Sequence, residues 1–188
     1  LPGGRGFTFW GPGVSQGHSD AARKIKGVID ARQYTLPIEG ALNRVRNGKT
    51  PDFTKRQMHK RLVYVVAVKG ADKEKIRREI VEMPNYYSDY DTKVVFITEK
   101  EMAEKHSAYP HGGFVMTSGV VGKNSRQILE YNCKLESNPG FTGSVLVACA
   151  RAAYRLKRKG QTGAYTMLDI PPSLYSPHTP EELRGHFV

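Results

Sequence analysis

The amino-acid sequence predicts an α+β fold with a mixed, mostly antiparallel sheet covered by helices. Segments typical of strands and of helices follow one another without strict alternation, and no segment repeats. Alternating apolar and polar residues indicate half-buried strands, whereas apolar residues three or four positions apart indicate helices that pack on them. With 188 residues, of which 39% are hydrophobic, the chain is long enough to enclose a core.

The first half of the chain begins with an aromatic strand and a glycine-rich turn. Residues Phe7–Trp10 are aromatic or β-branched and predict a strand, which a Gly-Pro-Gly turn ends because proline donates no hydrogen bond to a sheet. We expect a helix to follow, with Ser19 or Asp20 as its N-cap. The pattern then predicts strands over 28–36 and 62–68 and helices over 38–46 and 72–83.

The second half adds further strands and the longest helix. Thr98 is expected to cap a short helix, because Glu101 stands three residues later, as in a capping box. Asn138 followed by Pro139 predicts the start of a helix that runs to about residue 159, and Thr179 opens a last one. Strands are predicted over 92–97, 112–121, 128–135 and 165–170.

Composition narrows the classes of protein. The net charge of +11 suggests nucleic-acid binding, but the basic residues are spread along the chain and no recognised nucleic-acid module is present. Cys133 and Cys149 lie in apolar-periodic stretches and are expected to be buried free thiols, without the spacing of a zinc site. No apolar run approaches the length of a membrane span. The first residues look like the inside of a longer protein.

Few residues suggest chemistry by themselves. The strand, glycine turn and helix start over 7–21 form a natural cradle for a carboxylate or phosphate, or simply a connecting loop with a cap. Arg61 is the best partner for a carboxylate, the alternative being a solvated arginine at a strand start. His111 stands beside paired glycines, where a structural role is the alternative. The glycines lack the spacing of a dinucleotide-binding fingerprint.

A series of motifs resembles a known family. In order, they are FTFWG, SQGHSD, QYTLP, KRQMHKR, MPNYYSDYD, YPHGGF, KLESNPGFTGS and ARAAYRLKRKGQTGA. Together they span nearly all 188 residues and resemble the substrate-binding half of the meso-diaminopimelate dehydrogenase family. The family's N-terminal half, which binds NADP, is not covered. The resemblance implies that 1–137 form a substrate-binding and dimerisation region, and that 138–188 form a C-terminal helix and tail that pack against the missing nucleotide-binding domain.

The resemblance also implies the site. The family holds the distal L-centre of its substrate with a threonine, an arginine, a histidine and an asparagine, which match Thr35, Arg61, His111 and Asn138. A tryptophan that walls the ligand matches Trp10. The loop that meets the reacting end matches Gln16 and Gly17. No catalytic residue, cofactor ligand or metal ligand is expected in this chain.

The same resemblance implies that the parent protein is an enzyme of lysine biosynthesis that forms a homodimer in the cytoplasm. It reversibly deaminates the D-centre of meso-2,6-diaminopimelate with NADP, giving L-2-amino-6-oxopimelate and ammonia. This chain alone is expected to be inactive, because the cofactor domain is absent, and to bind neither nucleic acid nor membrane. The alternative is a non-catalytic amino-acid-binding or dimerisation module.

Overall fold

We describe the protein from a computed structural model that covers residues 4–187, without the side chain of the last of these. The chain divides into two compact units, 1–137 and 138–188, and each is described by itself. Over the described residues, no helix combines the length and the apolar character that crossing a membrane requires.

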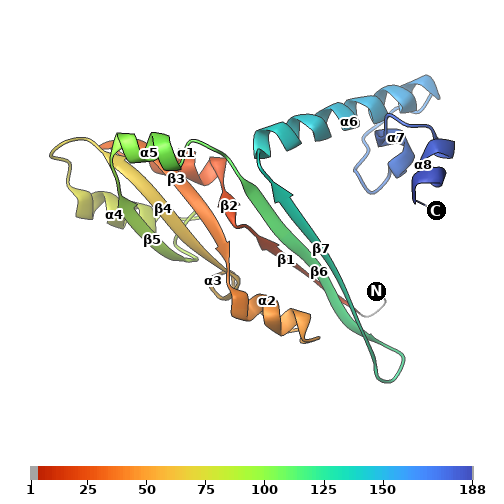
Figure 1. Ribbon diagram of the computed structural model, residues 1–188, viewed down its shortest axis with the longest axis horizontal. Helices are drawn as coiled ribbons and strands as arrows, with labels where there is room; N and C mark the ends of the chain where they lie inside the picture. The colour runs from red at the N-terminus through yellow and green to blue at the C-terminus, as the bar shows by residue number, and fades with distance from the viewer. Residues whose placement is uncertain (1–3, 188) are drawn as a thin grey trace. The chain divides into compact units, whose positions relative to one another are not determined.

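The first unit contains a three-stranded antiparallel sheet in the order β1-β6-β7 (Figure 1). Its strands are β1 (Arg5–Trp10), β6 (His111–Val121) and β7 (Ser125–Leu135). One face of this sheet packs on helix α2 (Glu39–Arg46), where Phe9 and Met116 meet Leu42 and Val45 in a fully buried cluster. The helix forms because its three buried positions, Ala41, Leu42 and Val45, lie on one stripe.

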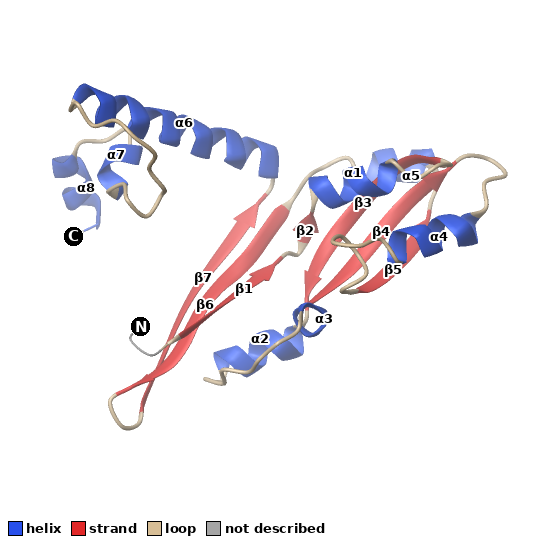
Figure 2. Ribbon diagram, turned by 180° about the vertical axis from the view of Figure 1, so that it is seen from behind, coloured by secondary structure: helices blue, strands red, loops and turns tan. Residues whose placement is uncertain are grey.

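A second sheet, four-stranded, has the order β2-β3-β4-β5 (Figure 2). Its strands are β2 (Gly13–Val14), β3 (Val28–Pro37), β4 (His59–Ala67) and β5 (Asp91–Phe96). The first two pairings are antiparallel, whereas β4 and β5 are parallel and are joined through helix α4 (Lys73–Val81). A parallel pair needs such a crossover connection.

Helices cover both faces of this second sheet. On one face, α1 (Gln16–Arg23) and α4 bury Ala22, Ile76 and Ile80 against β3, β4 and β5. On the other face lies α5 (Glu99–Lys105), and just beyond it His106 stacks on the ring of Tyr64 with centroids 4.1 Å apart. A short helix, α3 (Lys55–Met58), immediately precedes β4 and begins with a capping box.

The second unit consists of the long helix α6 (Asn138–Arg158), α7 (Pro172–Tyr175) and α8 (Pro180–Phe187). Two arginines of α6 hydrogen-bond the segment around α7. Arg155 donates to the backbone carbonyls of Ser173, Leu174 and Ser176. Arg151 donates to the backbone carbonyl of Tyr175. Ser173, Leu174 and Tyr175 belong to α7, and the last carbonyls of so short a helix have no partner within it, so the arginines supply their donors.

The predicted α+β class, with mostly antiparallel sheets and covering helices, is confirmed. Most predicted elements lie within a few residues of the observed ones. The short elements β2, α3 and α7 were not predicted.

Three local predictions were wrong. Ser15, not Ser19 or Asp20, is the N-cap of α1, because the buried Ser19 hydroxyl bonds within the helix and to β3. The expected strand over 165–170 is a turn, in which the carboxylate of Asp169 accepts hydrogen bonds from Thr166. Neither cysteine is buried: Cys133 is exposed, because it lies on the face of the three-stranded sheet that α2 does not cover, and Cys149 is only partly buried.

Candidate functional site

The centre of the candidate site is the side chain of Arg61, which β4 carries into the interior with only 7% of the residue exposed. One guanidinium nitrogen donates to the hydroxyl of Thr35, and the guanidinium carbon lies 4.0 Å from the centre of the Tyr90 ring. The Nε atom is buried and has no hydrogen-bond partner. Across the part of the chain that the structure describes, no carboxylate forms an ion pair with Arg61. A buried cation without a counter-ion indicates a site for an anion.

Strand register explains why Thr35 meets Arg61. The antiparallel pairing of β3 with β4 places the two residues directly opposite each other. Gln33 lies two residues away on the same face of β3, is fully buried, and donates its amide to Thr35 Oγ1 at 3.2 Å. The Thr35 oxygen therefore accepts two hydrogen bonds, which leaves its own O–H free to donate to a third group.

The turn after β1 packs between this pair and the start of β6, whose first residue is His111. The N–H of Gly11 donates to the carbonyl of Gly112 at 2.7 Å, and the N–H of Val14 donates to that of Pro110 at 2.8 Å. Gly11 has φ of +93°, and a side chain there would collide with the carbonyl of Thr35, so only glycine fits.

Trp10 and His111 are brought together by that packing. The two rings meet edge to face with centroids 6.3 Å apart. Trp10 is 56% exposed, which is high for an aromatic residue and leaves most of the indole open to a ligand.

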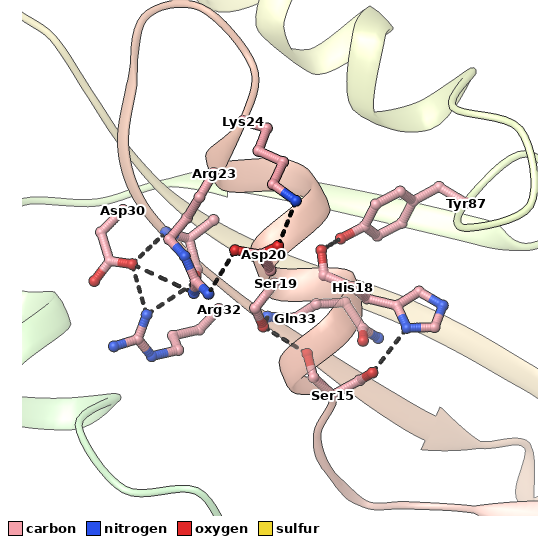
Figure 3. Close-up of polar contacts among 11 residues, drawn as sticks. Ser15, His18, Ser19, Asp20, Arg23, Lys24, Asp30, Arg32, Gln33 and Tyr87 are labelled. Carbon is pink, nitrogen blue, oxygen red and sulfur yellow. Dashed lines mark hydrogen bonds and ion pairs between the residues drawn. The ribbon is translucent and has the colours of Figure 1, made fainter.

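The start of α1 is also open. Its first residues, Gln16 and Gly17, are exposed, and the N-cap Ser15 makes no side-chain capping bond. Instead, the Ser15 hydroxyl bonds Nδ1 of His18 at 2.7 Å, and the hydroxyl of Tyr87 donates to the His18 carbonyl at 2.6 Å (Figure 3). The N–H groups of a first helical turn have no intrahelical partner, so they can donate to a carboxylate.

Burial and the Arg61 charge set the protonation states around the site. Burial, reinforced by the positive charge of Arg61, lowers the pKa of His18 from 6.5 to about 4, and the same two causes lower that of His59 to about 4. Burial raises the pKa of the Tyr87 hydroxyl well above its usual range. Both histidines and the tyrosine are therefore neutral at pH 7.

The first unit thus brings Trp10, Thr35, Arg61 and His111 into one region, with Gln16 and Gly17 at the helix start beside it. Asn138 lies in the second unit, as the first residue of α6, and is not placed relative to the others. Sequence reasoning missed His59, Gln33 and Tyr90. The first two could have been found from the period of two along a strand, since they share faces with Arg61 and Thr35.

The described residues contain no cluster of histidine, cysteine and acidic side chains that could hold a metal ion.

Comparison with known proteins identifies the family. Residues 1–137 match the family model of the diaminopimelic acid dehydrogenase C-terminal domain. The chain is 55% identical over 186 residues to the meso-diaminopimelate D-dehydrogenase of Acetivibrio thermocellus, covering 98% of this chain and 56% of that protein. It is 56% identical over 188 residues to the enzyme of the same name from Lysinibacillus sphaericus, covering 100% of this chain and 58% of that protein. The chain therefore spans little more than half the length of these relatives.

Solved structures show the same fold. A diaminopimelate dehydrogenase of C. glutamicum in complex with DAP is 46% identical, with a TM-score of 0.92, and is matched over 100% of this chain and 58% of that one. A multiply substituted meso-diaminopimelate dehydrogenase of Clostridium tetani with DAP is 49% identical, with a TM-score of 0.91 and the same coverage. The chain belongs to the diaminopimelate dehydrogenase family, and residues 1–137 correspond to its C-terminal domain.

Proposed function

We propose that this chain is the substrate-binding part of an NADP-dependent dehydrogenase of lysine biosynthesis. The complete protein would reversibly deaminate the D-centre of meso-2,6-diaminopimelate to L-2-amino-6-oxopimelate and ammonia. The observation that carries the proposal is the buried guanidinium of Arg61, which has a neutral hydroxyl and an aromatic ring as neighbours and no acidic partner among the described residues. Diaminopimelate carries a carboxylate at each end, and one of them would supply the missing counter-ion.

Each proposed contact follows from the chemistry of the side chain. Arg61 would bind the carboxylate of the L-centre through two parallel charge-assisted hydrogen bonds, and Thr35 would donate its free O–H to the same end. His111 and Asn138 would complete this end, while Trp10 walls the ligand. Matched polar groups of this kind penalise ligands that leave them unpaired, so they set which end of the substrate reacts.

A solved relative supports this set of residues. The Clostridium tetani protein with DAP carries six substitutions, at a glutamine, a threonine, an arginine, a proline, a histidine and an asparagine. Successive substituted positions are 19, 26, 49, 1 and 27 residues apart in that protein. The same residue types at the same spacings occur here, as Gln16, Thr35, Arg61, Pro110, His111 and Asn138.

The cofactor would bind outside this chain. An engineered D-amino acid dehydrogenase bound to NADP⁺ is 44% identical, with a TM-score of 0.87, and this chain covers 58% of it. NADP accepts the hydride when it is bound. The residues of this chain would hold the D-centre carbon against it, so the start of α1, with Gln16 and Gly17, would face the reacting end. The chain alone would have no dehydrogenase activity.

The second unit would pack against that missing nucleotide-binding domain. Its apolar side chains are unusually open for a helix and its tail: Phe141 is 48% exposed, Leu146 64%, Val147 59% and Leu168 97%. We propose that the nucleotide-binding domain covers these exposed apolar side chains.

We also propose that the protein is a homodimer. On the face of the three-stranded sheet that α2 leaves open, Val115, Leu129 and Tyr131 are 51%, 47% and 70% exposed. A self-complementary contact between two copies would bury the same patch on each. Tyr131→Lys should convert a dimer to a monomer in light scattering of the complete protein; an unchanged mass would exclude this face. The unpaired thiols of Cys133 and Cys149 fit a reducing compartment such as the cytoplasm.

The substitution Arg61→Met tests the proposed function. In the complete protein, it should lower kcat/KM for meso-diaminopimelate by roughly 30- to 1,000-fold, as expected when a charge pair worth about 2–4 kcal/mol is lost. Preference should shift toward simple D-amino acids, which have no second carboxylate. Arg61→Lys keeps the charge but not the planar fork, so it should give an intermediate loss. Unchanged selectivity would refute the proposal, and tight diaminopimelate binding without any turnover would indicate a non-catalytic binding module.

A further inference from the structure

We propose that His59 is a positioning residue that sets where the Trp10 wall stands relative to the Arg61 guanidinium. The inference rests on the proposed function, because it assigns a role in the same site. No contact between His59 itself and the ligand is proposed.

The contact that supports this role is a hydrogen bond between segments 49 residues apart. The backbone N–H of Trp10 donates to Nε2 of His59 at 2.8 Å. His59 is only 6% exposed, and its ring packs on Phe9 with centroids 6.0 Å apart. Because a backbone N–H can only donate, Nε2 must be the unprotonated ring nitrogen, and Nδ1 carries the hydrogen.

This bond connects the two sheets where they carry the site. Trp10 is the last residue of β1, in the three-stranded sheet, and His59 is the first residue of β4, in the four-stranded sheet. Strand β1 hydrogen-bonds only to β6 in its sheet, so the N–H of Trp10 finds its acceptor in a side chain instead of in a neighbouring strand. Without that acceptor, the part-buried N–H would be left unpaired where the chain turns into Gly11.

Strand β4 carries both His59 and Arg61. His59 and Arg61 are two residues apart on β4, so their side chains lie on one face with Cα atoms about 7 Å apart. His59 therefore fixes the backbone of Trp10 at a set distance from the guanidinium. A change at His59 should move the wall while leaving every proposed ligand contact chemically intact.

Three substitutions separate positioning from simple structural support. The amide oxygen of glutamine reaches about as far as Nε2 and can accept the Trp10 N–H, so His59→Gln should keep KM for diaminopimelate within about twofold of the unsubstituted value. His59→Leu removes the acceptor, and His59→Asn is too short to supply one. Both should raise that KM on the order of tenfold, as for a buried donor left unpaired, with KM for NADP unchanged.

The emission of Trp10 gives a second readout that does not depend on activity. Trp10 is the single tryptophan of the 188-residue chain, so in this chain, measured by itself, the emission maximum reports this wall directly. It should shift in His59→Leu and His59→Asn and stay in place in His59→Gln. Ile80→Val, a change at a buried position of α4, is the control for a general loss of stability and should alter neither KM nor emission.

The outcomes distinguish the two proposals. If Arg61→Met impairs diaminopimelate turnover but His59→Leu and His59→Asn leave KM and emission unchanged, the positioning role is wrong and the proposed function stands. If Ile80→Val raises KM as much as His59→Leu does, the effect is general destabilisation and the positioning role is again wrong. If Arg61→Met has no effect on turnover, the proposed function itself fails.

Discussion

Replacing Arg61 with methionine should make the folded chain more stable while abolishing its response to the ligand. The guanidinium is buried without an acidic partner among the described residues, and burying such a charge costs several kcal/mol. Methionine has a similar length and no charge. The substitution loses the hydrogen bond to Thr35, worth about 1.5–3 kcal/mol, and the stacking on Tyr90, worth up to about 2 kcal/mol.

Replacing buried charged groups with hydrophobic residues of similar volume is typically neutral or stabilising by up to about 4 kcal/mol. We therefore expect a net gain of about 1–2 kcal/mol in the free energy of unfolding. For a chain of this size, that gain corresponds to a rise of roughly 3–6 °C in Tm. Thermal and urea unfolding of the purified chain measure it. Arg56→Met is the matched control, because Arg56 is exposed and pairs with Asp91 at 3.0 Å, so its loss should change stability by less than about 0.5 kcal/mol.

Ligand dependence completes this prediction. In the complete protein, millimolar diaminopimelate should raise the Tm of the unsubstituted form and leave that of Arg61→Met unchanged, since only a ligand that binds the folded state stabilises it. A loss of more than about 1 kcal/mol on Arg61→Met would refute the reasoning. It would mean that the folded chain already satisfies the guanidinium and that no anion is needed.

Three further predictions concern neighbouring groups. Thr35→Val should raise KM for diaminopimelate about tenfold and lower stability by about 1–2 kcal/mol, because Gln33 and Arg61 lose their shared acceptor. Thr35→Ser keeps the hydroxyl and should preserve both quantities, as measured by steady-state kinetics and urea unfolding. Gly13→Ala should cost more than about 2 kcal/mol, because the new methyl group would collide with the backbone of Pro110 and His111. Gly40→Ala, in open space on α2, should instead gain up to about 1 kcal/mol in the same unfolding assay. Because the folded pKa of His59 is about 4 and the unfolded value is 6.5, the unfolded state binds more protons between these values, so this histidine should lower stability by roughly 2–3 kcal/mol as pH drops from 6.5 to 4. His18, whose folded pKa is also about 4, should add a similar fall, so His59→Gln should roughly halve the slope of stability against pH in unfolding curves at pH 4, 5.5 and 7.

Local sequence pattern predicted most of the fold because most elements are set by local periodicity. Strand β4 and helix α4 follow directly from their runs of apolar residues. The cap of α1 was misassigned because the decisive partner of Ser19 is Gln33, fourteen residues away on another strand. The tail over 165–170 has strand-forming residues, yet a single aspartate side chain holds it as a turn.

The site was predictable only in part. The residue types and the family motifs pointed to Arg61, but its lack of an acidic partner among the described residues depends on which strands meet around it. The bond from Trp10 to His59 depends on two sheets that no local pattern joins. The division into two sheets could not be read from strand order, because alternation identifies strands without showing which of them pair.

A crystal structure of the complete protein with meso-diaminopimelate tests the central claim most directly. The claim is that the buried guanidinium of Arg61 binds the carboxylate at the non-reacting end of the substrate. We predict two nitrogens of Arg61 within about 2.7–3.2 Å of that carboxylate, with the Thr35 hydroxyl donating to the same group. A ligand whose carboxylates both lie elsewhere, with Arg61 paired to an acidic side chain of the protein, would contradict it.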